Sequence, residues 1–304
     1  MNIAIIGAGL SGANIYNLLK KDNNNVSIFE KSRGAGGRCS TRYIDDKKID
    51  HGTPYFKVSN IEFKEFCDDM CKNNSLIKKS DYYYPSNGMN QFCNNLINQK
   101  DLFKNTKIVS CKYQNNYWIL KDENEIEYKN FDKLIITIPA IQALELDIKL
   151  TDSIYKKLKD VSYNSIATLI IYGNTLKNIL NPELLSSKDF KKVIDNSSKY
   201  NYYDFSSYVV HLNEQITNEQ NFQNKDEIEY FMLKKIYELC GINLKDEFYI
   251  IPHFWKYAFV SKPIKENYLY EDDLSLGFCG DYFMGEDLQS AYISSKRLYE
   301  QRFK

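Results

Sequence analysis

The segment NIAIIGAGLSGANIYNLLKKDNNNVSIFE, residues 2–30, decides the fold. NIAIIG is a short apolar run with β-branched residues, which is typical of a buried parallel strand. The glycines that follow open a segment with apolar residues at helical spacing, and after the turn DNNN the run VSIFE predicts a second strand. The segment therefore predicts a strand–helix–strand unit within a parallel sheet.

The turn between the first strand and the helix carries Gly7, Gly9 and Gly12 in the pattern G-x-G-x-x-G. Glycines at these positions let the backbone approach a pyrophosphate closely, and the N-terminus of the helix stabilises its charge. Glu30 ends the second strand, where a carboxylate can accept from a ribose hydroxyl and disfavours a 2′-phosphate on that ribose. A solvated loop carboxylate is the alternative for Glu30. The pattern predicts a bound dinucleotide but does not identify it.

The next stretch, KSRGAGGRCSTR at residues 31–42, holds three of the five arginines of the chain. Arg38 follows Gly36 and Gly37, and its guanidinium can offer a fork to phosphate oxygens that lysine cannot reproduce. Arg42, at the entry to a predicted hairpin, could instead face the cofactor ring or the substrate. The alternative is a surface loop with solvated charges.

A third element lies near the C-terminus, in LSLGFCGDYFMGEDLQSA at residues 274–291. A predicted strand runs into Gly280 and Asp281, and a helix is expected to begin near residues 285–287. An aspartate here can hold a ribityl or ribose hydroxyl, and the helix N-terminus can stabilise negative charge on a reduced flavin. On its own this pattern is weak, because Gly-Asp is a common turn.

The rest of the chain predicts mixed α and β structure without repeats or a clear linker. Residues 43–56 predict a hairpin with its tip at 45–47, and 60–74 an amphipathic helix. A turn at 85–88 precedes another helix, and 106–139 predict a series of strands. The region 153–260 predicts strands at 167–172, 206–212 and 248–255 and a helix at 225–240.

Composition excludes several classes of function. The formal net charge is zero and the isoelectric point is about 6.8, which argues against a nucleic-acid-binding surface. No apolar run approaches the length of a membrane span, and the N-terminus predicts a strand and turn instead of a signal peptide. Seven cysteines without a C-x-x-C pair, together with only three histidines, predict reduced thiols in a cytoplasmic protein and no metal site.

The three motifs together resemble the FAD-binding fold of flavin amine oxidases and glutathione-reductase-like flavoproteins. In detail the chain is similar to renalase and the bacterial renalase-like oxidoreductases, and the resemblance spans almost the whole length. The matching stretches are FEKSRGAGGRCSTR (29–42), IDHGTPYF (49–56), Gly88-Met89, LIITIPAIQAL (134–144), PHFWKYA (252–258) and LGFCGDYFMGEDLQSAYISS (276–295). The chain departs from that pattern at Phe254, where the family usually has arginine, and at Ser295, where it usually has glycine.

The resemblance implies an α/β fold in which a Rossmann-type FAD-binding domain is interleaved with an α+β substrate domain. The FAD-binding domain is expected at 1–56, 85–144 and 262–304, and the substrate domain at 57–84 and 145–261. FAD is expected to bind non-covalently. The residues predicted to contact it are Gly7, Gly9, Leu10, Ser11, Gly12, Glu30, Lys31, Gly36, Gly37, Arg38, Arg42, His51, Val109, Gly280, Asp281, Asp287 and Leu288.

Candidates for the active site are His51, His253, Trp255 and Tyr257. His51 follows the arginine-rich loop and is therefore expected near the isoalloxazine ring, although a hydrogen-bonded hairpin histidine is equally consistent. The other three alternate along one strand and so share a face, where they could stack a flat ring against flavin or simply pack a sheet. His211 is expected to be structural.

The source of electrons follows from what the sequence lacks. No second G-x-G-x-x-G motif and no C-x-x-C or C-x4-C redox pair occurs, so reducing equivalents are expected from a small-molecule substrate over the flavin. The leading hypothesis is hydride transfer from a dihydro-substrate to flavin N5, with O2 as electron acceptor giving H2O2. By resemblance the substrate is a 2- or 6-dihydro isomer of NAD(P)H. The alternatives are a flavin amine oxidase acting on a small amine and an FAD-binding protein without turnover.

Overall fold

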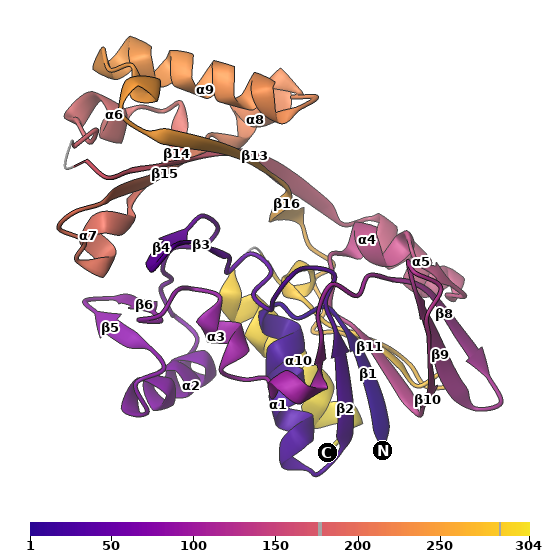
Figure 1. Ribbon diagram of the computed structural model, residues 1–304. Helices are drawn as coiled ribbons and strands as arrows, with labels where there is room; N and C mark the ends of the chain where they lie inside the picture. The colour runs from indigo at the N-terminus through magenta and orange to yellow at the C-terminus, as the bar shows by residue number, and fades with distance from the viewer. Residues whose placement is uncertain (176–177, 286) are drawn as a thin grey trace. The chain divides into compact units, whose positions relative to one another are not determined.

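The computed structural model describes residues 1–175, 178–285 and 287–304, and it divides the chain into two compact units (Figure 1). Unit 1 comprises Met1–Cys39, Tyr55–Ser162 and Val260–Lys304, and unit 2 comprises Ser40–Pro54 and Tyr163–Phe259. Glu286, which falls in the predicted start of the last helix, lies outside the described residues.

Unit 1 is built on a six-stranded sheet whose interior strands are parallel. The apolar strand β1 lies between β2 and β11, with Ile5 opposite Ile28 on one side and Ile135 on the other. The strand order is β17 (Leu269–Glu271), β18 (Leu276–Phe278), β11 (Lys133–Ile136), β1 (Asn2–Ile6), β2 (Asn25–Phe29) and β7 (Leu102–Phe103). Only β17 runs antiparallel to its neighbour. The predicted strand–helix–strand unit and its parallel sheet are confirmed.

The first and last helices of the chain, α1 (Leu10–Lys21) and α10 (Leu288–Arg302), pack against each other in unit 1 (Figure 1). Ser11 Oγ donates to the Ala291 carbonyl at 3.0 Å, and Asn14 Nδ2 donates to Ser295 Oγ at 2.9 Å. Ser295 Oγ also donates to the Tyr292 carbonyl. Ser295, a departure from the pattern of the renalase-like proteins that the sequence resembles, is therefore hydrogen-bonded within this helix pair.

The remaining elements of unit 1 surround these two layers. A second sheet has the order β10 (Glu127–Phe131), β9 (Tyr117–Asp122), β8 (Ile108–Gln114) and β12 (Asp147–Ile148). The others are α2 (Ile61–Lys72), β5 (Ile77–Lys79), β6 (Tyr82–Tyr84), α3 (Gln91–Asn94), α4 (Ala140–Leu144), α5 (Asp152–Lys159) and the 3₁₀ segments Gln99–Asp101 and Asp281–Phe283.

Unit 2 is a four-stranded sheet with apolar residues on both faces. Its order is β14 (Phe190–Asp195), β15 (Ser206–Leu212), β13 (Ser162–Gly173) and β16 (Tyr249–Lys262). The first residue of β13 and the last three residues of β16 belong to unit 1. Its other elements are the hairpin of β3 (Thr41–Ile44) and β4 (Lys47–Asp50), and helices α6 (Pro182–Ser186), α7 (Asn196–Tyr200), α8 (Glu214–Gln220), α9 (Lys225–Cys240) and the 3₁₀ segment Leu244–Asp246.

Alternation along the strands of unit 2 separates its two faces. Leu169 and Val210 pack in the core that contains Met232 of α9, whereas their neighbours Ile170 and Val209 pack with Ile49 of the hairpin. We call the second side the hairpin face of the sheet. No helix among the described residues is long and apolar enough to cross a membrane.

The compact units do not follow the predicted domain boundaries. Residues 57–84 belong to unit 1, because Phe63 of α2 stacks near Phe92 and Tyr292 at ring-centroid distances of 6.4 and 5.0 Å. Residues 40–54 belong to unit 2, because the hairpin covers its sheet. Compactness does not decide which residues bind substrate, so the functional division stays a prediction.

Candidate functional site

The glycine turn after β1 is held tightly in unit 1. Gly7 has φ +103°, and a Cβ atom on Gly12 would lie 2.0 Å from the Gly7 carbonyl oxygen. Thr137 Oγ1, at the end of β11, donates to that same oxygen at 2.9 Å. Any side chain at Gly12 would therefore displace the turn, which makes glycine a structural requirement there.

Gly9 differs from its neighbours, because a Cβ atom built on it meets nothing within 4 Å. Its φ of −72° is open to any residue, and no side chain caps the first turn of α1. The first N–H groups of a helix need partners, and phosphate oxygens are suitable acceptors. The open space beside Gly9 and the uncapped helix end thus fit a pyrophosphate.

Glu30 lies beside this turn with its carboxylate buried. One oxygen accepts from the Ala8 N–H at 2.9 Å and the other from the Ser32 N–H at 2.8 Å. These bonds fix the side chain at the end of β2, and a carboxylate has further lone pairs with which to accept from hydroxyl groups. This geometry fits a bound ribose.

The Gly36-Gly37 turn packs against the glycine turn. Both residues have positive φ, 141° and 56°. The Gly36 N–H donates to the Ala8 carbonyl at 2.9 Å, and a Cβ atom on Gly37 would lie 3.3 Å from Gly9 Cα. Two glycine-rich segments that are 24 residues or more apart in sequence thus pack directly against each other.

Arg38 and Asp281, predicted as separate cofactor contacts, pair with each other. Arg38 Nη1 lies 2.6 Å from Asp281 Oδ2, and Nη2 lies 2.6 Å from Oδ1. The Asp281 carboxylate is buried, and the preceding Gly280 N–H donates to Ser294 Oγ at 3.1 Å. The fork predicted to bind phosphate therefore also joins the Gly36-Gly37 turn to the C-terminal segment, a role that the sequence did not indicate.

The other predicted cofactor residues occupy varied positions in unit 1. Lys31 is exposed, Val109 is half-buried in β8, and Leu10 and Leu288 are the first residues of α1 and α10. Asp287 caps α10 by accepting from the Ser290 N–H at 2.8 Å. Their contacts with a cofactor stay predictions.

Two buried thiols lie under the Gly36-Gly37 turn. Cys93 Sγ is 3.9 Å from the Gly36 carbonyl oxygen, and its hydrogen bond with Cys39 and its burial hold the pKa of the Cys93 thiol well above its usual range. All seven cysteines are free. The Cys93 thiol is therefore neutral and a poor nucleophile at neutral pH.

In unit 2 the structure brings together three of the four predicted active-site residues. The His51 ring centroid lies 5.1 Å from that of His253 and 5.5 Å from that of Trp255, and the last two are 4.4 Å apart. Tyr257 instead pairs with Tyr163 at 5.4 Å. The predicted alternation is confirmed, since Phe254 and Lys256 are exposed between half-buried neighbours.

The backbone of His51 is held by two side chains of the sheet. Trp255 Nε1 donates to the His51 carbonyl at 3.2 Å, and His211 Nε2 contacts the same oxygen at 3.0 Å. A carbonyl only accepts, so His211 must carry its proton on Nε2. This agrees with a structural role for His211.

All three histidines are held neutral. Burial lowers the pKa of His51 to about 3, assisted by His253 and Arg42, while the nearby Ile49 carbonyl acts in the opposite sense. Burial, Lys225 and Arg42 lower the pKa of His253 to about 4. Burial likewise lowers the pKa of His211 to about 4. The site therefore offers neutral imidazoles in a positively charged environment.

A buried ionic network anchors the residue before His51, and sequence reasoning missed it. Asp50 is fully buried and accepts from Thr41 Oγ1 at 2.6 Å, from Lys199 Nζ and from the Tyr200 hydroxyl. Asn196 Oδ1 accepts from the Asp50 N–H at 3.0 Å. Because Lys199, Tyr200 and Asn196 come from α7, about 150 residues away, no local pattern could have revealed these partners.

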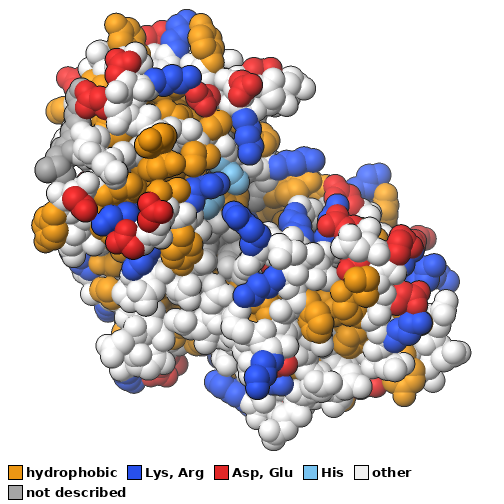
Figure 2. All heavy atoms as spheres, in the orientation of Figure 1, with side chains coloured by type: hydrophobic (Ala, Val, Ile, Leu, Met, Phe, Trp, Pro, Cys, Tyr) orange, Lys and Arg blue, Asp and Glu red, His pale blue; other side chains and the backbone are white. Residues whose placement is uncertain are grey.

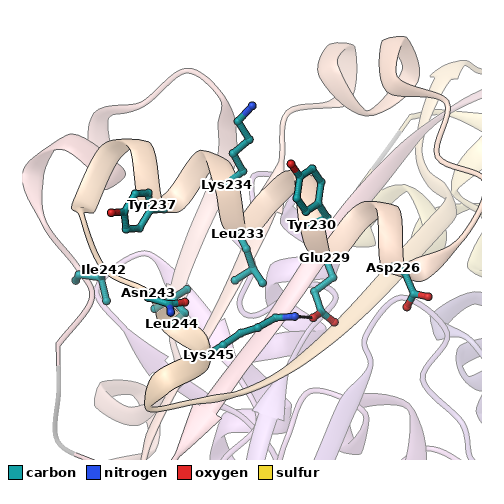
Figure 3. Close-up of a pocket in the computed structure, with 10 residues that line it drawn as sticks. All are labelled: Asp226, Glu229, Tyr230, Leu233, Lys234, Tyr237, Ile242, Asn243, Leu244 and Lys245. Atoms are coloured by element: carbon teal, nitrogen blue, oxygen red, sulfur yellow. Dashed lines mark ion pairs between the residues drawn. The ribbon is translucent and has the colours of Figure 1, made fainter.

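A separate open groove of about 480 Å³ runs along α9 (Figure 3). Leu233 lies in it, Tyr230 and Tyr237 are exposed beside it, and Lys245 reaches Glu229 at 2.6 Å. None of the residues predicted to bind cofactor or to form the active site lines this groove. Its charged groups include a mutual ion pair, and it holds no histidine or cysteine, so it carries no evident chemistry.

Comparisons with known proteins agree with the architecture. A family model described as an NAD(P)-binding Rossmann-like domain matches residues 5–70. A CLA-producing fatty acid isomerase from P. acnes superposes with a TM-score of 0.70 at 11% identity, covering 99% of this chain and 98% of that one. Cyclohexylamine oxidase from Brevibacterium oxydans IH-35A gives 0.67 at 11% identity, covering 97% of each chain.

A third structure, wild-type putrescine oxidase bound to putrescine, gives a TM-score of 0.62 at 12% identity and covers 99% of each chain. Identities this low show the fold alone. The predicted fold class, an α/β fold with a Rossmann-type domain, is confirmed, and its architecture matches that of these structures.

Proposed function

We propose that this chain is an FAD-dependent oxidoreductase of the renalase-like kind. It takes hydride from a small dihydro-substrate, a 2- or 6-dihydro isomer of NAD(P)H, and passes the electrons to O2. The cytoplasmic location expected from the cysteine pattern stays a prediction.

The two glycine turns of unit 1 and the residues beside them support the choice of cofactor. Gly9 and the start of α1 would hold the pyrophosphate, Glu30 the adenosine ribose, and Arg38 with Asp281 would join the two segments around it. A bound, non-covalent flavin supplies a two-electron acceptor that O2 can reoxidise to give H2O2. The residues present fit this group, because a Cβ atom on Gly9 would meet nothing within 4 Å and no side chain caps the first turn of α1.

The positive charge around His51 and His253 is the observation that carries the choice of substrate. Arg42 lowers the pKa of both histidines, and Lys225 lowers that of His253 further. Figure 2 shows histidine atoms at the surface, and beside them side chains in the colour shared by Lys and Arg. This environment favours an anionic or electron-rich substrate and opposes an ammonium cation.

The side chains of unit 2 would orient the substrate instead of activating it by strong base catalysis. A dihydropyridine is already poised to lose hydride, so positioning contributes most of what it needs. Trp255 and His253 provide flat faces, and His51 provides a neutral imidazole whose backbone is fixed by two hydrogen bonds. The Ser40 carbonyl accepts from the His51 N–H at 3.1 Å, which also holds this residue in the hairpin.

An amine oxidase is the second candidate. Cyclohexylamine oxidase and putrescine oxidase share the fold, and the aromatic side chains at Trp255 and Tyr257 would accommodate a neutral amine. The positive surroundings count against it, since small alkylamines are protonated at neutral pH. A third alternative is an FAD-binding protein without turnover.

Anaerobic titration of the purified protein tests the proposal. Dihydronicotinamide isomers are expected to bleach the flavin absorbance, and admission of air is expected to restore it with formation of H2O2. Bleaching by cyclohexylamine or putrescine alone would favour the amine oxidase. Flavin that no compound of either series reduces would favour the binding protein.

A further inference from the structure

The hairpin face of unit 2 gathers polar atoms that lack partners. Among the described residues, Arg42 Nε, His51 Nδ1 and Thr168 Oγ1 are buried side-chain atoms without a hydrogen bond of normal geometry. A buried polar atom that is left unpaired loses the hydrogen bonds it made to water and gains none in return, so such atoms call for an explanation. A bound ligand that forms hydrogen bonds with all three atoms would explain why they lack partners in the protein.

Strand pairing places these atoms together. Arg42 is opposite Ile49 in the β3–β4 ladder, and the His51 N–H continues that ladder to Ser40. Cross-strand partners and alternate residues share a face, so the side chains of Arg42, Ile49 and His51 project to the same side. Thr41 and Asp50 project to the other side, as their 2.6 Å hydrogen bond requires.

The sheet supplies the third atom on this side. Thr168 is directly opposite His211 in the β13–β15 ladder, and His211 contacts the His51 carbonyl. Arg42 also lowers the pKa of both His51 and His253, which agrees with its place on this side of the hairpin. The unpaired groups are thus neighbours of the aromatic side chains already described.

We propose that Arg42 and His51 form a subsite that binds a carboxylate or carboxamide carried on a flat ring of the substrate. Arg42 Nε–H can only donate, and it would donate to the oxygen of that group. His51 would add a second hydrogen bond from its neutral ring, and Trp255 with His253 would lie along the ring face. This rests on the proposed function, because it names the part of that substrate by which unit 2 recognises it.

Three ring compounds of one shape test the subsite on the purified full-length protein. Nicotinate carries the carboxylate, nicotinamide the carboxamide, and 3-methylpyridine neither. Isothermal titration calorimetry is expected to give dissociation constants at least about tenfold lower for nicotinate and nicotinamide than for 3-methylpyridine, since hydrogen bonds from charged donors are the strong ones. Equal affinities, or binding of none of the three, would overturn the proposal.

Variants assign the preference to Arg42. Arg42→Gln is expected to weaken nicotinate about tenfold or more and to leave 3-methylpyridine unchanged. Arg42→Lys keeps the positive charge but lacks the Nε donor. Its affinity for nicotinate is expected to lie between those of the unchanged protein and Arg42→Gln. Arg302→Gln is the matched control, since that arginine is partly exposed and pairs with Asp272 at 3.0 Å. Unchanged nicotinate affinity in both Arg42 variants would contradict the assignment.

A second readout does not depend on ligand affinity or turnover. The chain has only three histidines, so proton NMR can follow each one separately. Removing the positive charge in Arg42→Gln is expected to raise the pKa of His51 and His253, and nicotinate is expected to shift the His51 signals. A folded Arg42→Gln protein with both pKa values unchanged would show that Arg42 lies away from the rings.

The subsite and the proposed function can fail independently. Nicotinate binding that depends on Arg42, in a protein that oxidises no dihydronicotinamide, would retain the subsite and reject the reaction. Oxidation of dihydronicotinamides without any preference among the three probes would retain the reaction and reject the subsite.

Discussion

His51, His253 and His211 lie in a small region of unit 2, and their neutral state is the most direct consequence of their burial. Below pH 6.5 the unfolded chain binds protons that the folded chain does not, so each of these histidines makes stability fall as the pH falls. The window runs from about pH 6.5 down to about 4 for His253 and His211 and to about 3 for His51.

We therefore expect the free energy of unfolding to decrease by up to about 1.4 kcal/mol per pH unit for each histidine within this window. Urea unfolding at pH 7.0, 5.5 and 4.5 measures it, and His51→Gln is expected to make the decrease shallower. A histidine signal in the folded protein that titrates above pH 6 would contradict the electrostatic account.

Asp50 and Lys199 make a second prediction at this scale. Lys199→Met leaves a fully buried carboxylate without its cation and is expected to cost about 3–5 kcal/mol of stability. Burial and Asp50 raise the pKa of Tyr200, so this hydroxyl remains a donor but cannot replace the charge. Chemical denaturation measures the loss.

Lys245→Met is the matched control for Lys199→Met. It removes a lysine whose side chain is 58% exposed and pairs with Glu229, and such pairs contribute less than about 1 kcal/mol. The double variant Asp50→Asn with Lys199→Met is expected to recover part of the loss. Equal effects of the two lysine variants would mean that the network does not hold the hairpin.

Among the elements, the glycine turn between β1 and α1 separates folding from cofactor binding. Gly12→Ala would force a Cβ atom to 2.0 Å from the Gly7 oxygen and is expected to destabilise the fold. Gly9→Ala meets only open space in the protein and is expected to fold normally but to lose FAD, because its methyl group would occupy the place of the pyrophosphate. Thermal melting and the flavin-to-protein absorbance ratio measure the two effects. Full FAD retention in Gly9→Ala would place the pyrophosphate elsewhere.

The pair of Arg38 and Asp281 joins the Gly36-Gly37 turn to the end of β18. Arg38→Lys keeps the charge but loses the bidentate geometry, so FAD is expected to dissociate at least several-fold faster. Arg297→Lys is the control, since Arg297 also forms a fork with a carboxylate, that of Glu62, but on α10 and α2 away from the turn. If both variants lose FAD equally, the loss reflects general destabilisation of unit 1 and not a specific role of Arg38.

For the whole molecule, local pattern predicted those parts whose structure is set by neighbouring residues. The strand–helix–strand unit, the hairpin tip at Asp45 and helix α9 all carry their signals within a few residues. The contacts that shape the site were not predictable, because Arg38 meets Asp281 across 243 residues and Asp50 meets Lys199 across 149. The division into units differed for the same reason, since burial of Phe63 and Ile49 depends on distant partners.

The identity of the compound that reduces the bound flavin is measured most directly by stopped-flow absorbance under anaerobic conditions. A 6-dihydro isomer of NADH and cyclohexylamine are mixed separately with the flavin-loaded protein at equal concentrations. We expect the dihydro isomer to reduce the flavin at least about a hundredfold faster, because a substrate poised to lose hydride gains from orientation alone. Faster reduction by the amine would contradict the account.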